Sequence, residues 1–176
     1  RNVNYQGSTV RAQRGRDAEH EIEVLLEEVH NGTQRVLQWE DGRKIEAKIP
    51  PGVKTGSKIR LRGQGGRGAR GGQAGDLYIV IHVEPHDFFQ RENDLIYCRF
   101  PLGMAQAALG CTLEVPTIHG RKKLTVPKGT QPGDTFRLKG EGVPSLRGHG
   151  KGDMVIEIQV IIPEKLNKRQ KELLEE

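Results

Sequence analysis

The sequence predicts a mostly β protein made of two tandem, similar small β-sandwich or barrel-like domains, each with one short helix, plus a short C-terminal helix. Three observations predict this fold: an internal repeat, short segments in which apolar and polar residues alternate, and glycines at the turns between them. Apolar residues make up 34% and aromatic residues 5% of the 176 residues, which suits two small cores better than one large core.

The internal repeat is the strongest of these signals. Three motifs recur farther along the chain, the first at a shift of 78 residues and the other two at a shift of 77. They are Gly42-Arg43 with Gly120-Arg121, Arg60-Leu61 with Arg137-Leu138, and Gly75-Asp76 with Gly152-Asp153. A register that slips by a single residue over this distance indicates two copies of one supersecondary plan.

The first copy begins with a strand and a short helix. Ile22 and Val24 alternate with glutamates, which is the period of a half-buried strand. Residues 25–31 are predicted to form one or two helical turns. Gly32 suits the left-handed position that ends such a helix.

A hairpin and two further strands complete the first copy. Asp41-Gly42 is a strong signal for a two-residue turn between residues 36–39 and residues 45–49. Residues 59–61 form a short strand, which a long glycine-rich loop follows. Residues 77–83 are apolar on both faces, and we expect them to form a buried central strand.

The second copy is expected to repeat these elements in the same order, with a hairpin turn at His119-Gly120. Its strands are predicted over residues 95–100, 113–118, 124–126, 136–138 and 154–162, and its helix over residues 104–109. Asn167 and Gln170 have the spacing of a capping box, which predicts a terminal helix.

These elements divide the chain into four segments. Residues 1–16 are expected to form a flexible linker, residues 17–87 the first β domain, residues 88–163 the second, and residues 164–176 the start of a C-terminal helix for dimerisation. Because the chain begins without Met and ends in a charged stretch, we expect it to be a fragment of a longer protein.

The sequence offers no constellation for catalysis or metal binding. Residues 63–68 match G-x-G-x-x-G, but a loop continues to residue 75 where a dinucleotide site would need a helix. The six histidines lack ligand spacing with each other and with Cys98 and Cys111. We expect no enzyme activity, metal or cofactor, and reduced cysteines, although a disulfide between the two stays open.

The charge balance is basic, with a net charge of +5 and a pI of about 9.3. Such a balance permits nucleic-acid partners, and Arg67 and Arg70 of the glycine-rich loop could contact phosphates. A soluble surface of mixed sign is the commoner explanation. No apolar run approaches the ~20 residues of a membrane helix, and no signal peptide is recognisable. We therefore expect a cytoplasmic protein without membrane contact.

Trp39 is the only tryptophan, and it shares a strand face with Leu37 and Arg35. Leu37 and Trp39 could fill the first core. Alternatively, they could line an apolar groove in which an extended peptide pairs with an edge strand. The alternation by itself favours core packing.

Four stretches carry motifs that are specific in combination. They are residues 49–65, which begin Ile49-Pro50-Pro51-Gly52-Val53, and residues 75–86, 93–97 and 107–117. Together they resemble the C-terminal domains of the DnaJ family of J-domain co-chaperones, from Asp17 to Glu176. The chain is similar to the zinc-free subgroup, which includes curved-DNA-binding relatives, because it lacks the cysteine-rich zinc module. It also lacks the His-Pro-Asp tripeptide of a J-domain.

The resemblance implies a client-binding groove in the first domain. Its positions here are Ile22, Leu37 and Trp39, with Phe89 at the end of the domain. Arg35 matches a basic position that receives the acidic tail of a partner chaperone. The resemblance thus favours the groove over core packing at Leu37 and Trp39.

The resemblance also implies the partners. Unfolded polypeptide clients would be held in the groove for delivery to a DnaK-type, ATP-driven chaperone, and the full-length protein would form a homodimer. The alternative function is DNA or RNA binding through the basic surface. Phosphate binding falls steeply with salt whereas apolar capture does not, so salt dependence distinguishes the two.

Overall fold

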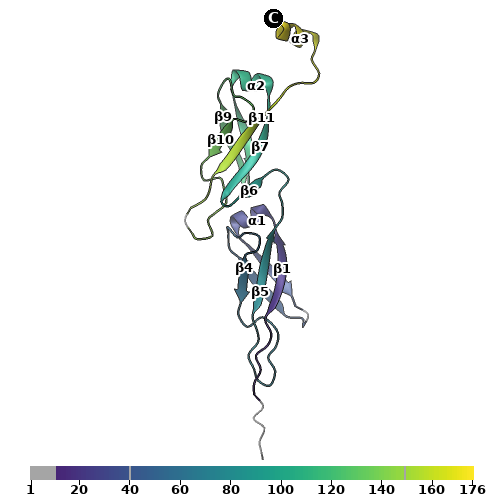
Figure 1. Ribbon diagram of the computed structural model, residues 1–176, viewed down its shortest axis with the longest axis vertical. Coiled ribbons are helices and arrows are strands. Elements are labelled where there is room, and N and C mark those ends of the chain that lie inside the picture. The colour runs from purple at the N-terminus through teal and green to yellow at the C-terminus, as the bar shows by residue number, and fades with distance from the viewer. Residues whose placement is uncertain (1–10, 40, 149) are drawn as a thin grey trace, which may run out of the picture. The chain divides into compact units, whose positions relative to one another are not determined.

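The computed structural model describes residues 11–39, 41–148 and 150–176 (Figure 1). The chain folds as two compact units, the first ending at Glu84 and the second beginning at Pro85. We call them unit 1 and unit 2. The fold is mostly β with a few short helices, as the sequence predicts.

Unit 1 contains a three-stranded sheet, a separate hairpin and one short helix. The sheet has the order β1-β5-β4, with β1 parallel and β4 antiparallel to β5. The hairpin joins β2 to β3, and α1 connects β1 to β2. The bounds are β1 Ala18–Val24, α1 Leu26–Asn31, β2 Thr33–Gln38, β3 Lys44–Ile49, β4 Lys58–Leu61 and β5 Leu77–Val83.

Unit 2 repeats this plan and adds one short strand and a terminal helix. Its sheet has the order β10-β11-β7-β6, with β7 and β11 parallel, and its hairpin pairs β8 with β9. The bounds are β6 Gln90–Glu92, β7 Leu95–Gly103, α2 Met104–Leu109, β8 Cys111–Thr117, β9 Gly120–Val126, β10 Thr135–Leu138, β11 Met154–Ile161 and α3 Lys168–Glu175.

The core of unit 1 lies where the alternation predicts it. Leu77, Ile79 and Ile81 of β5 are fully buried, and the alternate residues of β3 pack as deeply. Tyr78 and Val80, on the other face of β5, are half-buried. The predicted central position of β5 is confirmed, and its burial is complete on one face only.

The end of each short helix differs from the predicted left-handed conformation. Gly32 has a φ of 75° and a ψ of 159°, and Gly110 has a φ of 77° and a ψ of 156°. The positive φ is as expected, but the ψ is extended because the chain passes directly from the helix into a strand. This region of backbone space is open essentially to glycine alone.

The first predicted hairpin turn is in the predicted place but longer, and the second is displaced by one residue. The Trp39 N–H, one residue past β2, donates to the Arg43 carbonyl over 2.8 Å, so the turn between them is longer than Asp41-Gly42. In the second hairpin Thr117 pairs with Gly120, so the two-residue turn is Ile118-His119.

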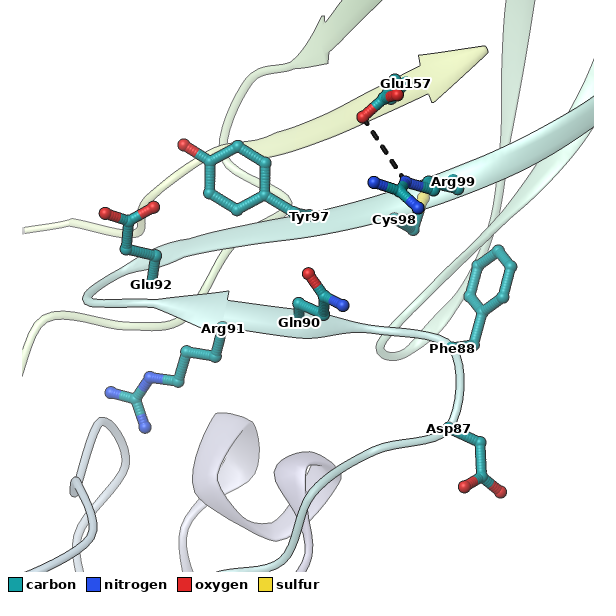
Figure 2. A pocket seen from close by; sticks show the side chains of 9 residues that line it. All are labelled: Asp87, Phe88, Gln90, Arg91, Glu92, Tyr97, Cys98, Arg99 and Glu157. Atoms are coloured by element: carbon teal, nitrogen blue, oxygen red, sulfur yellow. Dashed lines mark ion pairs between the residues drawn. The ribbon is translucent and has the colours of Figure 1, made fainter. Parts of the chain in front are cut away.

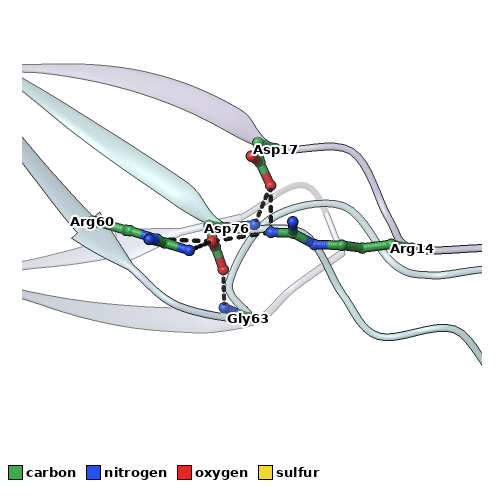
Figure 3. A network of polar contacts seen from close by, with 5 residues as sticks. All are labelled: Arg14, Asp17, Arg60, Gly63 and Asp76. Atoms are coloured by element: carbon green, nitrogen blue, oxygen red, sulfur yellow. Dashed lines mark hydrogen bonds and ion pairs between the residues drawn. The ribbon is translucent and has the colours of Figure 1, made fainter.

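An aspartate at the start of the central strand ties unit 1 together (Figure 3). The Gly63 N–H donates to Asp76 Oδ1 over 2.8 Å, and Arg60 Nε donates to Asp76 Oδ2 over 2.9 Å. Arg14 Nη2 lies 3.1 Å from the same oxygen. The Gly63 hydrogen bond, followed by the Arg60 hydrogen bond, lowers the pKa of Asp76 below its usual value.

Unit 2 has the matching contacts at Asp153. The Gly140 N–H donates to Asp153 Oδ1 over 2.9 Å, and Arg137 Nη1 lies 3.5 Å from Asp153 Oδ2. The repeated Gly-Asp motif is thus a structural clamp between the central strand and the loop that precedes it.

The terminal helix α3 has the predicted capping box. The Gln170 N–H donates to Asn167 Oδ1 and the Asn167 N–H donates to Gln170 Oε1, both over 2.8 Å. Residues 1–10 of the predicted linker lie outside the described residues, whereas Gln13 is hydrogen-bonded to Ala69. No helix in the described part of the chain is long and apolar enough to cross a membrane.

Candidate functional site

The first strand of the unit 1 hairpin has two unlike faces. Val36 points to one side and is 67% exposed. Arg35, Leu37 and Trp39 point to the other side, where each is half-buried. This second face therefore holds two large apolar side chains that the fold covers only in part.

Trp39 meets strand β1 through an aromatic contact. Its ring and that of His20 stand edge to face, with centroids 6.1 Å apart. His20 and Ile22 lie two residues apart on β1 and so share a face. Ile22 is 8% exposed. The structure thus brings β1 and the Trp39 end of the hairpin together, while the indole stays partly accessible.

Unit 2 fills the equivalent positions differently. At the repeat shift of 78 residues, Leu37 corresponds to Val115 and Trp39 to Thr117. Val115 is 0% exposed and Thr117 is 6% exposed. Smaller residues are thus enclosed in unit 2 at positions where larger ones stay accessible in unit 1.

Strand edges beside this face also carry backbone N–H and C=O groups. Among the described strands, β2 pairs with β3 alone and β1 pairs with β5 alone. Each strand therefore has an edge whose N–H and C=O groups lack a strand partner. An extended peptide can pair with such an edge while neighbouring pockets take its side chains.

Arg35 is already engaged by its own chain. Its Nη2 atom lies 2.7 Å from Glu28 Oε1 and donates to Glu28 Oε2 over 2.8 Å. Glu28 belongs to α1 and also accepts the Leu25 N–H over 2.9 Å. An acidic ligand at Arg35 must therefore share or replace the carboxylate of Glu28.

Phe89 belongs to unit 2 and is 6% exposed. Its ring packs 4.9 Å from His86 and 5.0 Å from Phe88, measured between centroids. The N–H groups of Phe88 and Phe89 both donate to His86 Nδ1 over 3.0 Å. These contacts of Phe89 are with its own unit, and its role in the groove stays a prediction.

Unit 2 has a separate hollow of about 660 Å³ on its sheet (Figure 2). Tyr97 and Phe88 contribute rings to it, and Arg99 and Glu157 form an ion pair of 3.7 Å within it. Arg91 points to the opposite side of β6 from Gln90. The charged lining makes this hollow a poorer match for an apolar segment than the face of Leu37 and Trp39.

No candidate metal site is found among the described residues, because no group of three or more His, Cys, Asp or Glu is placed to hold an ion. Cys98 and Cys111 are free thiols. Burial raises the pKa of Cys98 to about 11, which keeps it protonated near neutral pH and therefore a poor nucleophile.

Sequence reasoning missed two residues of this face, His20 and Glu28. His20 lies two residues before Ile22, so strand periodicity could have placed it on the same face. Glu28 is three residues after Leu25, which is a capping-box spacing, but its pairing with Arg35 depends on how α1 packs against β2.

Comparison with known proteins decides the family. Residues 18–163 match the family model described as DnaJ C terminal domain. The chain belongs to the DnaJ C-terminal domain family. The match spans both units and so covers the face of Leu37 and Trp39.

Several relatives carry the name chaperone protein DnaJ. The one from Geobacillus sp. (strain WCH70) is 56% identical over 134 residues, covering 76% of this chain and 35% of the relative. Those from Halothermothrix orenii and Desulfotalea psychrophila are 55% and 54% identical over 132 residues. Each of these two matches covers 75% of this chain and 35% of the relative. The chain thus spans about a third of the length of these relatives.

Proposed function

We propose that this chain is the client-binding part of a DnaJ-type co-chaperone and has no catalytic activity of its own. Unit 1 holds extended, unfolded polypeptide on a client surface that we define as Ile22, Leu37 and Trp39. The observation that carries the proposal is the partial exposure of Leu37 and Trp39 where unit 2 encloses Val115 and Thr117.

Simple energetics predict weak capture by one such surface. Covering about 150 Å² of apolar area contributes roughly 4 kcal/mol at about 25 cal/mol per Å². Ordering the client subtracts from this gain, so a single contact is no tighter than about millimolar. Pairing of the client backbone with a free strand edge adds to it. Weak binding suits hand-over of the client to a DnaK-type, ATP-driven chaperone in the cytoplasm.

The proposal includes a role for Arg35 and a subgroup. The acidic tail of the DnaK-type partner would replace Glu28 as the carboxylate partner of Arg35, and the observed pairing of Arg35 with Glu28 supports this role. Phe89 would contribute at the end of the client path. We place the chain in the zinc-free subgroup, and Gly32 alone separates α1 from β2, which supports this placement.

We also propose that the full-length protein is a homodimer joined near α3. Apolar residues of α2, β11, α3 and the segment between β11 and α3 line a hollow of about 490 Å³ in unit 2. They include Met104, Ile161, Leu166, Leu173 and Leu174. A second copy that covers this hollow would remove apolar surface from water and would present two client surfaces to one long client, which raises the effective concentration.

The experiment that tests client binding combines Leu37→Ala with Trp39→Ala. We expect the double variant to lose suppression of aggregation of a chemically unfolded reporter protein, because both partly exposed apolar side chains are removed. Circular dichroism establishes that the variant is folded. Val36→Ala is the matched control, since Val36 lies on the same strand, is exposed and faces the other way. A folded double variant that suppresses aggregation as well as the wild type contradicts the proposal.

A further inference from the structure

Two segments of unit 1 form an extended ribbon. We call residues 11–17 and residues 60–76 the arginine ribbon. Gln13 and Ala69 exchange backbone hydrogen bonds of 3.0 and 2.9 Å, which pairs the first segment with the second. The ribbon projects from the end of the β1-β5-β4 sheet opposite to α1 (Figure 1).

Glycine packing fixes the backbone of this ribbon. A Cβ atom on Gly15 would lie 1.9 Å from the Gly66 carbonyl oxygen, and one on Gly72 would lie 1.9 Å from the Gln13 carbonyl oxygen. Only glycine permits the two segments of the ribbon to approach this closely. Side chains between the glycines therefore project from a backbone whose course is set in advance.

The ribbon carries a charge equal to that of the whole chain. It holds seven arginines against two aspartates, a net charge of +5, and the chain's net charge is also +5. The remaining residues are therefore balanced. The charged residues are Arg11, Arg14, Arg16, Arg60, Arg62, Arg67 and Arg70, with Asp17 and Asp76.

Several of these arginines lack an acidic partner among the residues that the structure describes. Arg14 and Arg60 pair with Asp76, and Arg67 lies 3.6 Å from Asp41. Within the described ranges, no ion pair involves Arg11, Arg16, Arg62 or Arg70, and all four are exposed. Arg14, Arg60 and Arg62 also line a hollow of about 630 Å³ at the base of the ribbon.

The ribbon begins beside one end of the client surface. Trp39 is hydrogen-bonded to Arg43 across the hairpin, from N–H to carbonyl over 2.8 Å. Arg43 Nη2 in turn donates to the Gly65 carbonyl of the ribbon over 3.2 Å. A polypeptide that leaves the client surface at Trp39 therefore reaches the ribbon within the same unit.

The chemistry of the ribbon is charge without apolar surface. Apart from Leu61 of β4, none of its apolar side chains is larger than that of alanine. It therefore offers guanidinium groups, which bind carboxylates in a fork geometry, and no aromatic platform on which nucleic-acid bases could stack.

We propose that the arginine ribbon binds an acidic stretch of the same client whose apolar segment covers Leu37 and Trp39. The inference rests on the proposed client binding and names the class of client: apolar segments joined to runs of Asp or Glu. The client carboxylates would neutralise the arginines that have no acidic partner in the described part of the chain.

Three labelled peptides test this inference on the whole chain. Each has the same apolar segment, joined to five Glu, five Ser or five Lys residues, and each is made in both orders. We expect the Glu peptide to bind about tenfold more tightly than the Ser peptide at low salt, since a few exposed pairs each contribute modestly. The advantage should shrink in about 0.5 M salt because exposed charges are screened.

A matched pair of variants locates the effect. Arg16→Gln, Arg62→Gln and Arg70→Gln together should abolish the advantage of the Glu peptide and leave the affinity for the Ser peptide unchanged. Lys139→Gln, Arg147→Gln and Lys151→Gln remove the same charge from exposed cations of unit 2 and should preserve the advantage. Thermal unfolding shows whether each variant is folded, and the salt titration of the wild type needs no variant.

The outcomes separate the two proposals. Failure of the Ser peptide to bind, or binding that Trp39→Ala leaves intact, contradicts the client surface itself. A Ser peptide that binds through Trp39, with no gain from Glu or an equal gain from Lys, overturns the ribbon inference alone. The inference is also overturned if a single-stranded oligonucleotide, and not the Glu run, binds through Arg16, Arg62 and Arg70.

Discussion

The hairpins of the two units follow one plan but close differently. In unit 2 the strand β8 turns Val115 and Thr117 inward, and both are enclosed. In unit 1 Leu37 of β2 and Trp39, which directly follows β2, face the same way, and both remain half-exposed. The comparison teaches that the fold itself needs only small residues at these positions.

Large apolar side chains at an accessible position therefore require another explanation than packing. Exposed apolar surface is a hydration cost that folding normally removes. In unit 1 it coincides with strand edges that are free among the described residues and with a neighbouring cluster of arginines. The proposed contact with a client polypeptide would account for all three features together.

The strongest test of the shared plan is the central strand of each unit. Ile79 and Ile156 are equivalent at the shift of 77 residues, and both are fully buried. Replacing either with Ala should cost about 2–5 kcal/mol of unfolding free energy because it leaves a cavity. Denaturant unfolding followed by circular dichroism measures both losses. A large loss for one variant and none for the other would break the equivalence of the units.

The difference between the hairpins can be sharpened by transplanting residues into unit 2. Val115→Leu with Thr117→Trp should destabilise unit 2 by about 1–3 kcal/mol, since the enclosed site has to accommodate extra volume. Thermal unfolding measures the loss. A double variant as stable as the wild type would show that β8 also tolerates an open apolar face, and the contrast between the units would disappear.

The helix-ending glycines offer a finer comparison. Replacement of either by Ala should cost about 1 kcal/mol or more, because alanine disfavours the positive φ. Gly110→Ala should cost more than Gly32→Ala, since its Cβ would lie 2.8 Å from the Lys128 nitrogen, whereas the nearest atoms to a Cβ on Gly32 lie at 3.2 Å. Equal losses in parallel denaturant titrations would show that the backbone relaxes around Gly110.

The smallest effect concerns pH and the clamp of unit 1. The pKa of Asp76 is lowered by its hydrogen bonds to Gly63 and Arg60. Its ionised form therefore stabilises the fold above the usual aspartate pKa of about 3.9, and this stability is lost as the pH falls through the lowered pKa. Asp76→Asn should reduce the Tm at pH 7, and the difference from the wild type should narrow below about pH 4. A difference that stays constant with pH contradicts this role of the carboxylate.

Much of the fold could be predicted because the alternation is local. The strands of Ile22 and Val24, the central strands and the capping box of α3 follow from periodicity and residue type. The short strand β6 was missed, because three polar residues give no alternation to detect. The parallel pairing of β1 with β5 joins segments far apart in the chain, and no local pattern encodes it.

The site was less predictable, because exposure depends on packing. Alternation placed Leu37 and Trp39 on one face but could not decide whether neighbours enclose them. The resemblance to the family favoured a groove at these positions. The engagement of Arg35 by Glu28 and the join between the ribbon and the hairpin tip depend on contacts between separate segments.

One titration tests client binding most directly. Trp39 is the only tryptophan in the chain, so its fluorescence reports on the client surface without a label. An apolar peptide bound there should shift the Trp39 emission to shorter wavelength in proportion to binding, in low and high salt alike. A peptide that binds by anisotropy while the Trp39 emission stays unchanged would contradict the assignment of the client surface.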